Sequence, residues 1–185
     1  ILLGDKFRGE SGEVIRRLKT MGIAHTVLLS GDREQAAREL GAAVGIDEAH
    51  GLLLPEEKSG ILESLAKNIG PTLMVGDGIN DTPALATAHV GVAMGSRGSD
   101  AALETAGVVL LHDDLRRLPQ LLAVARRTRR LIRQNIALAV GLKLIVFGLT
   151  LAGVGSLWMA VLADTGASVL VVLNGLRALK TVELP

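Results

Sequence analysis

Short apolar runs alternate with helical patterns along the first 112 residues. The apolar runs predict buried strands at Thr26–Leu29, Leu73–Val75, Val90–Met94 and Val108–Leu111. The helical patterns between them cover Arg33–Val44, Thr82–Ala88 and Ser99–Ala106. Strands that alternate with helices in this way are typical of βαβ units, so we predict an α/β fold with a parallel sheet over residues 1–112.

Residues 135–174 have a different pattern, two apolar runs with almost no break between them. Each run, Asn135–Gly153 and Ser156–Asn174, is close to the roughly 20 residues that a helix needs to cross about 30 Å of hydrocarbon. Only Val154 and Gly155 separate the runs, which predicts a transmembrane helical hairpin. A buried helical hairpin of a soluble domain is the alternative.

Basic residues flank this hairpin at both outer ends. Five arginines lie in the stretch 126–133, and Arg177 and Lys180 follow the second run. Because cytoplasmic flanks of membrane spans are rich in Lys and Arg, we expect both ends in the cytoplasm and the arginine stretch at anionic lipid headgroups. The predicted organisation is an α/β domain over 1–112, a basic helical connector over 113–134, the hairpin over 135–174 and a tail over 175–185.

Composition sharpens this division. The mean hydropathy of +0.41 is high for a soluble protein and averages two unlike parts. Of the 20 basic and 19 acidic residues, only five lie in residues 135–185. A formal net charge of +1 gives no argument for nucleic acid as a partner. The absence of cysteine excludes disulfides, zinc–thiolate sites and cysteine nucleophiles within these 185 residues.

Each apolar run contains one ionisable residue, Lys143 in the first and Asp164 in the second. From the rise of a helix, Lys143 lies about 12 Å and Asp164 about 18 Å from the cytoplasmic end, a gap that a lysine side chain can close. Mutual neutralisation is one interpretation, and a cation site with Asp164 as ligand and Lys143 as counter-charge is the other. Gly141, Gly148 and Gly166 would allow close helix approach in either case.

The segment MVGDGINDTPAL carries the most informative polar pattern. Two carboxylates, Asp77 and Asp81, flank a glycine turn at the end of a predicted strand, and hard oxygen ligands of this kind suit Mg²⁺ next to a phosphate. Gly76 and Gly78 let the backbone bend, the following helix N-terminus favours an anion, and Asn80 offers an amide donor. Taken alone, such a turn is more commonly a solvated loop.

Two further elements have the same chemical character. Ser30-Gly31-Asp32 supplies a hydroxyl and backbone N–H groups at the end of another predicted strand. Lys58, in LPEEKSGIL, supplies a cation that could offset charge on a transferring phosphoryl group. By itself, Lys58 would be interpreted as a surface lysine at a helix start. Polar groups at strand ends where helices begin occupy the usual ligand position of open α/β sheets.

Ser-Gly-Asp, Lys58 and GDGINDTPAL, in this order, resemble the haloacid-dehalogenase-type phosphorylation domain of the P-type ATPases. Ile1–Arg8 resembles that family's return into this domain, with Asp5 and Arg8 in its Asp-x-x-Arg hinge. VGVAMG and SDAALETAGVVLL are similar to the segments that follow. The resemblance covers essentially the whole chain and implies a Rossmannoid parallel sheet followed by two membrane helices.

The two charges in the apolar runs narrow this resemblance. The combination of a lysine in the first run with Asp-x-Gly (Asp164 and Gly166) in the second resembles the branch that exports zinc, cadmium and lead. The copper branch would have Tyr-Asn in the first run with a Met-and-Ser pattern in the second, and the cobalt-type branch His-Glu-Gly-Gly. Neither pattern is present. The resemblance implies that Asp164 binds the transported divalent metal, such as Zn²⁺, with Lys143 as counter-charge.

For the intact protein, the resemblance implies that ATP phosphorylates an aspartate and that water then hydrolyses the aspartyl phosphate. The cycle would be coupled to outward movement of the metal. Asp77 would be the leading Mg²⁺ ligand, with Asp81 beside it. Lys58 would pair with the nucleophile and the transferring phosphoryl group. The resemblance assigns the positioning of phosphoryl oxygens to Ser30, Gly31 and Asn80, and nucleotide and cofactor binding to Asp32, Arg8, Gly76 and Gly78.

The sequence departs from the family at one decisive motif. The family's phosphorylated aspartate lies in Asp-Lys-Thr-Gly-Thr, whereas Asp5-Lys6 is followed by Phe7 and Arg8. We therefore expect this chain to be the C-terminal portion of a pump and to be inactive by itself. The whole pump is expected to be an integral protein of a bacterial plasma membrane, with the α/β domain and the C-terminus on the cytoplasmic side. A membrane-tethered phosphatase of the same superfamily, or an inactive remnant that binds Mg²⁺ or partners, are the alternatives.

Overall fold

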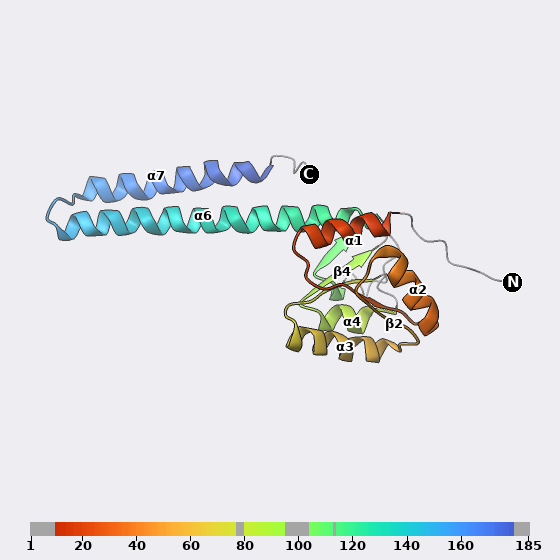
Figure 1. Cartoon of the computed structure of the whole chain (residues 1–185). Helices are drawn as coiled ribbons and strands as arrows, with labels where there is room; N and C mark the ends of the chain where they lie inside the picture. The colour runs from red at the N-terminus through yellow and green to blue at the C-terminus, as the bar shows by residue number, and fades with distance from the viewer. Residues whose placement is uncertain (1–9, 77–79, 95–103, 113, 180–185) are drawn as a thin grey trace. The chain divides into compact units, whose positions relative to one another are not determined.

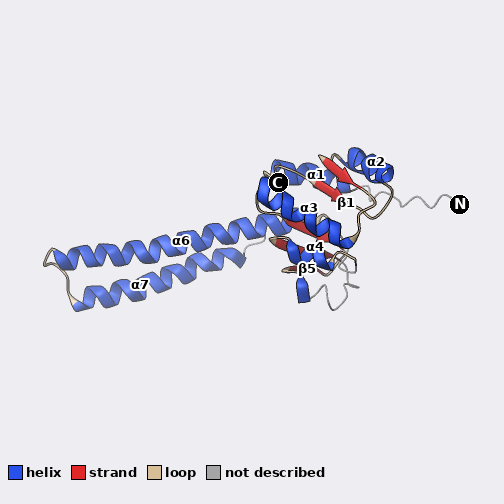
Figure 2. Ribbon diagram, turned by 90° about the horizontal axis from the view of Figure 1, so that it is seen from below, coloured by secondary structure: helices blue, strands red, loops and turns tan. Residues whose placement is uncertain are grey.

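The computed structural model describes residues 10–76, 80–94, 104–112 and 114–179. The chain forms two compact units, divided between Pro119 and Gln120. The first is an α/β unit and the second a pair of long helices, as the ribbons show (Figures 1 and 2). The predicted site residues Arg8, Asp77 and Gly78 lie outside the described residues, as does most of the predicted helix at Ser99–Ala106.

The described strands of the first unit are short and parallel. β1 (Val27–Leu29) pairs with β2 (Glu48–His50), and β4 (Val90–Met94) lies between β3 (Leu73–Gly76) and β5 (Val108–Leu110). The predicted parallel α/β fold is confirmed. The sequence did not predict β2, because Glu-Ala-His contains no apolar run. Its partner β1 determines its extended conformation through the parallel ladder.

Helices alternate with these strands. α1 (Ser11–Thr20) packs beside α2 (Glu34–Val44), and α3 (Pro55–Asn68) packs beside α4 (Thr82–Thr87). Figure 1 shows α3 and α4 together on one side of the strands. The core between them is formed by Leu62, Met74, Ala84, Leu85 and Ala93. Leu29 of β1 and Val109 of β5 pack against this core, so the two sheets share it.

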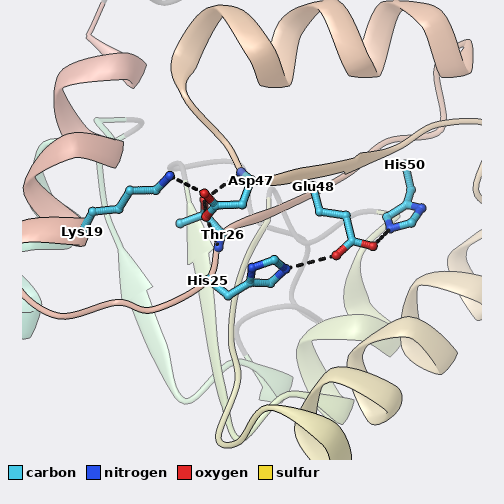
Figure 3. Close-up of polar contacts among 6 residues, drawn as sticks. All are labelled: Lys19, His25, Thr26, Asp47, Glu48 and His50. Atoms are coloured by element: carbon cyan, nitrogen blue, oxygen red, sulfur yellow. Dashed lines mark hydrogen bonds and ion pairs between the residues drawn. The ribbon is translucent and has the colours of Figure 1, made fainter.

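A polar network joins the segments that lead into β1 and β2 (Figure 3). Asp47 Oδ2 accepts hydrogen bonds from the amide of Thr26 at 2.9 Å and from its hydroxyl at 2.6 Å. Asp47 Oδ1 accepts a hydrogen bond from Lys19 Nζ at 2.6 Å. The Lys19 ammonium, together with these Thr26 donors, holds the pKa of Asp47 well below its usual range.

A second carboxylate of this network lies between two histidines (Figure 3). Glu48 Oε2 is 3.0 Å from His25 Nε2, and its Oε1 is 2.7 Å from His50 Nε2. The hydrogen bond with His25 lowers the pKa of the Glu48 carboxyl the most, and the hydrogen bond with His50 lowers it further. The two imidazoles bind opposite oxygens of one carboxylate, so this cluster ties the start of β1 to β2.

The second unit is a hairpin of α6 (Arg117–Leu151) and α7 (Leu157–Leu176), followed by the 3₁₀ turn η1 (Arg177–Leu179). Both helices are long and apolar enough to cross a membrane. α6 has 35 residues and is about 53 Å long, so the predicted basic connector and the first apolar run form one continuous helix. Ser156 caps α7 by accepting a hydrogen bond from the Met159 amide at 3.3 Å.

The glycines of α6 and α7 make no close contact with the other helix of the pair. A Cβ placed on Gly141, Gly148 or Gly166 would meet no atom within 4 Å beyond the local helix backbone. The expectation that these residues bring α6 and α7 together is therefore wrong for this pair. Asn174 Nδ2 instead donates a hydrogen bond to Asn135 Oδ1 at 2.8 Å, and Ala167 is the buried residue of α7.

We predict that Asp47→Asn lowers stability at neutral pH and that this loss shrinks in acid. Because the pKa of Asp47 is lowered by folding, its stabilisation is complete above the unfolded-state pKa and is lost as pH falls below about 4. Urea denaturation of the chain in detergent at pH 7, 5 and 3 measures the effect. Glu63→Gln, at an exposed position of α3, is the matched control. An Asp47→Asn deficit that stays constant down to pH 3 would contradict the prediction.

Candidate phosphate site and membrane ion pair

Lys58 lies one turn into α3 and is almost fully buried, with 8% of its surface exposed. Pro55 begins the helix, and the Glu57 carboxylate accepts a hydrogen bond from the Leu54 amide at 2.8 Å, which fixes the first turn. Lys58 Nζ donates to Asp81 Oδ1 at 2.6 Å. The interpretation of Lys58 as a surface lysine is therefore wrong, because its ammonium points inward to a carboxylate.

Asp81 is packed against the end of β3. A Cβ at Gly76 would lie 2.6 Å from Asp81 Oδ2 and 2.8 Å from Asp81 Cβ, so only glycine fits beside this carboxylate. Asp81 itself directly precedes α4, and Asn80 next to it is exposed. The structure thus brings three predicted residues together, Lys58, Gly76 and Asp81. Asp81 has one oxygen on Lys58 and the other against Gly76.

Ser30, Gly31 and Asp32 form a separate turn at the end of β1. Ser30 Oγ donates to Asp32 Oδ2 at 3.0 Å, and the Asp32 amide donates to Ser30 Oγ at 3.1 Å. Gly31 is exposed at its tip. Within the described residues, no hydrogen bond or ion pair joins this turn to Lys58 or Asp81. Both groups nevertheless follow carboxyl ends of parallel strands, as predicted.

The segment 51–53 holds the Ser30 turn, and no motif in the sequence pointed to it. The Ser30 amide donates to the His50 carbonyl at 2.9 Å, and the Leu53 amide donates to the Ser30 carbonyl at 3.0 Å. Leu52 adopts a left-handed backbone (φ 55°), and its amide donates to the Asp32 carbonyl. Gly51 gave no usable signal in the sequence, because the strand that it follows, β2, was itself not predicted.

Gly51 is required by close packing. A Cβ at this position would lie 2.5 Å from Glu34 Cα and 2.6 Å from Glu34 N, both backbone atoms. The Gly51 amide donates to Glu34 Oε2, and this hydrogen bond, with that of Arg38, lowers the pKa of Glu34. Glu34 therefore connects the N-terminus of α2 to the segment that supports the Ser30 turn.

The two charged residues of the apolar runs meet in the second unit. Lys143 Nζ of α6 lies 3.4 Å from Asp164 Oδ1 of α7. Both side chains are 69% exposed within this chain. The gap estimated from helix rise is thus closed by the lysine side chain. In the described ranges, no group of three His, Cys, Asp or Glu side chains is arranged to hold a metal ion.

Known proteins share this combination of an α/β unit and a helix pair. A family model described as haloacid dehalogenase-like hydrolase matches residues 1–89. A probable cadmium-transporting ATPase of Listeria monocytogenes is 46% identical over 180 residues, 97% of this chain. A zinc-transporting ATPase of Synechocystis sp. is 44% identical over 182 residues, also 97% of this chain.

A solved structure agrees with these relatives. The crystal structure of a zinc-transporting PIB-type ATPase in its E2.Pi state matches 95% of this chain with a TM-score of 0.88 and 45% identity. Over nearly its whole length the chain is thus similar to cadmium- and zinc-transporting P-type ATPases. It spans 25% of the length of each of the two curated relatives and 28% of the solved structure, so the matched region is about a quarter of such an ATPase.

We predict that Gly51→Ala destabilises this chain by about 2–3 kcal/mol, because the added methyl group must displace backbone of α2. The matched control is Gly60→Ala in α3, where a Cβ meets nothing within 4 Å. That change should stabilise by about 0.5–1 kcal/mol through helix propensity. Urea denaturation of the chain in detergent, with susceptibility to proteolysis as the readout, measures the free energy of unfolding of both variants. Equal stability of the two variants would rule out the packing argument.

A double-mutant cycle tests the buried ion pair. Lys58→Met and Asp81→Asn should each cost about 3 kcal/mol, because each leaves a partner without its counter-charge. The double variant should cost less than the sum, with a coupling energy of about 2 kcal/mol. The exposed i,i+4 pair Glu13–Arg17, at 2.7 Å, is the control and should couple by no more than about 0.5 kcal/mol. Additive costs at Lys58 and Asp81 would show that the pair does not stabilise the fold.

Proposed function

We propose that the intact protein is an ATP-driven pump that exports a divalent heavy metal, zinc, cadmium or lead, through an aspartyl-phosphate intermediate. This chain would supply the Mg²⁺ and phosphate site and part of the membrane metal site. The observation that carries the proposal is the contact between Lys143 and Asp164 on two helices long enough to cross a membrane. The names of the cadmium- and zinc-transporting relatives support it.

The open strand edges of the α/β unit leave room for a further strand. Among the described strands, β1 pairs only with β2, and β3 pairs only with β4, so each has one open edge. Leu29 of β1 already packs on the core around Met74 of β3. A strand that carries the nucleophilic aspartate would insert between these edges, join the sheets and bring its carboxylate to the strand ends where Lys58 lies.

Lys58 would then change partners. In this chain its ammonium neutralises Asp81, whereas in the intact protein it would also face the nucleophile and the transferring phosphoryl group. Its burial strengthens the attraction, because few water molecules screen the charge. Ser30, Gly31 and Asn80 would donate hydrogen bonds to phosphoryl oxygens. Nucleotide and cofactor contacts are proposed for Asp32, Arg8, Gly76 and Gly78.

The donor set at the end of β3 fits Mg²⁺. Asp81 presents carboxylate oxygens beside Gly76, where no side chain intervenes, and Asp77 adds a second carboxylate in the sequence. Hard carboxylate oxygens with space for water and phosphate ligands are what this ion prefers. Bound Mg²⁺ would neutralise phosphate charge. Asp77 and Asp81 would hold it, and Lys58 would keep Asp81 oriented through its hydrogen bond at 2.6 Å.

Asp164 would bind the transported metal, and Lys143 would be its counter-charge. Without metal, the ammonium at 3.4 Å stabilises the carboxylate inside the hydrocarbon region. A divalent cation on Asp164 repels Lys143, so metal binding and the ion pair would exclude each other. Basic flanks would place the outer ends of α6 and α7, and the α/β unit, on the cytoplasmic side of a bacterial plasma membrane.

Substitution of Asp164 in the intact protein tests this assignment. Asp164→Ala should reduce zinc-stimulated ATP hydrolysis by at least about 100-fold, since the proposed charged ligand of the metal is lost. Thr165→Ala, an adjacent exposed position of α7, is the control and should keep activity. Phosphorylation of the intact Asp164→Ala protein by inorganic phosphate without zinc should persist, which shows that the catalytic unit is folded. Zinc stimulation that is unchanged in Asp164→Ala would refute the metal role.

A further inference from the structure

A face of α6 just before its apolar run carries four positive charges. The arginines at i, i+3, i+4 and i+7 are Arg126, Arg129, Arg130 and Arg133. This spacing places them on one side of the helix. Together with Gln134 and Ala137 they line a hollow of about 400 Å³. The hollow lies within the second unit and belongs to neither the phosphate site nor the Lys143–Asp164 pair.

No Asp or Glu lies within the stretch of α6 that carries these arginines. The sequence has no Asp or Glu between Asp114 and Asp164. In the part of the chain that the structure describes, Arg129, Arg130 and Arg133 have no ion-pair partner, and all three are exposed. Their charge therefore attracts an anion from outside this chain, and guanidinium groups bind phosphate by two parallel hydrogen bonds.

A second hollow adjoins the first and adds an apolar surface. It measures about 480 Å³ and is lined by Gln134, Leu138, Leu170, Leu173, Asn174 and Arg177. Gln134 lines both hollows. Arg177 Nη1 donates to Asn174 Oδ1 at 3.1 Å, and Arg127 donates to the Arg177 carbonyl. The guanidinium of Arg177 is thereby held at the polar end of this groove.

Along the axes of α6 and α7, the polar groups of the two hollows are followed by leucines. Leu138 lies about 6 Å beyond Gln134 along α6, and Leu170 about 10 Å from Arg177 along α7. Cationic groups at one end and leucines one or two turns deeper match a lipid with a charged headgroup and an acyl chain. A free phosphate would contact only the arginines. A nucleic acid would not contact leucines that lie within a membrane span.

We infer that the two hollows form one binding site for an anionic phospholipid. The arginines of the first hollow, together with Arg177, bind the headgroup phosphate, and an acyl chain lies along Leu138, Leu170 and Leu173. This inference goes beyond the attraction of a basic segment to a membrane surface, because it assigns a groove between two helices. It rests on the proposed insertion of α6 and α7 in a membrane, but not on metal transport.

The test measures thermal unfolding of the intact protein in dodecyl maltoside micelles, titrated with phosphatidylglycerol, phosphatidylcholine or inorganic phosphate. Phosphatidylglycerol should raise the unfolding temperature, and the other two should not. The triple variant R129Q/R130Q/R133Q should weaken the apparent affinity for phosphatidylglycerol about 100-fold, from the contribution of three charges. R16Q/R17Q/R38Q removes three exposed arginines of the α/β unit and should respond like the unchanged protein.

The groove is tested separately from the charges. Leu170→Asn places a polar group where the acyl chain is expected, and it should weaken the phosphatidylglycerol response while leaving the arginines in place. Carbonate extraction of membranes verifies insertion. Release of the protein would overturn the membrane spans and the lipid site together. If the protein stays in the membrane, two results would overturn the lipid site alone. One is an equal response of the triple variant and the unchanged protein to phosphatidylglycerol, and the other is equal stabilisation by inorganic phosphate.

Discussion

A buried ammonium requires a counter-ion, and Lys58 is the buried ammonium on which the α/β unit depends. Its pairing with Asp81 at 2.6 Å ties the first turn of α3 to the residue that precedes α4. The Asp81 carboxylate in turn excludes any side chain at Gly76, the last residue of β3. One ion pair thus sets the geometry of a strand end, where α/β sheets bind phosphate. The same charges that stabilise the fold are those proposed for phosphoryl transfer.

In the proposed membrane setting the helix pair would meet the opposite constraint, because charge is costly where the surroundings are hydrocarbon. Lys143 and Asp164 satisfy that constraint by contacting each other at 3.4 Å. The sequence has no Asp or Glu between Asp114 and Asp164, so we infer that lipid neutralises Arg129, Arg130 and Arg133 of α6. The proposed metal site and the inferred lipid site therefore both depend on charged side chains in a helix pair that offers few polar partners.

The sequence predicted the elements that have strong local signals. Four strands of β-branched and apolar residues, the helix at Glu34–Val44 and the two long helices all lie where their patterns indicated. β2 was not predicted, since Glu48–His50 is extended only because β1 and the His25–Glu48 contact hold it. The role of the segment 51–53 was also invisible, because its backbone hydrogen bonds to Ser30 and Asp32 connect residues about 20 positions apart. The glycines of the apolar runs predicted a close helix approach that α6 and α7 do not use.

By itself the sequence determined the class of fold, the two-part organisation and the identity of the polar residues at the strand ends. It could do so because hydrophobic periodicity and short motifs act over a few neighbouring residues. Only the tertiary structure decided that Lys58 is buried on Asp81 rather than exposed, that Ser30 is held by the segment after β2, and that Lys143 reaches Asp164. Each of these depends on a partner distant in sequence, and the burial that makes such a contact necessary exists only after the chain has folded.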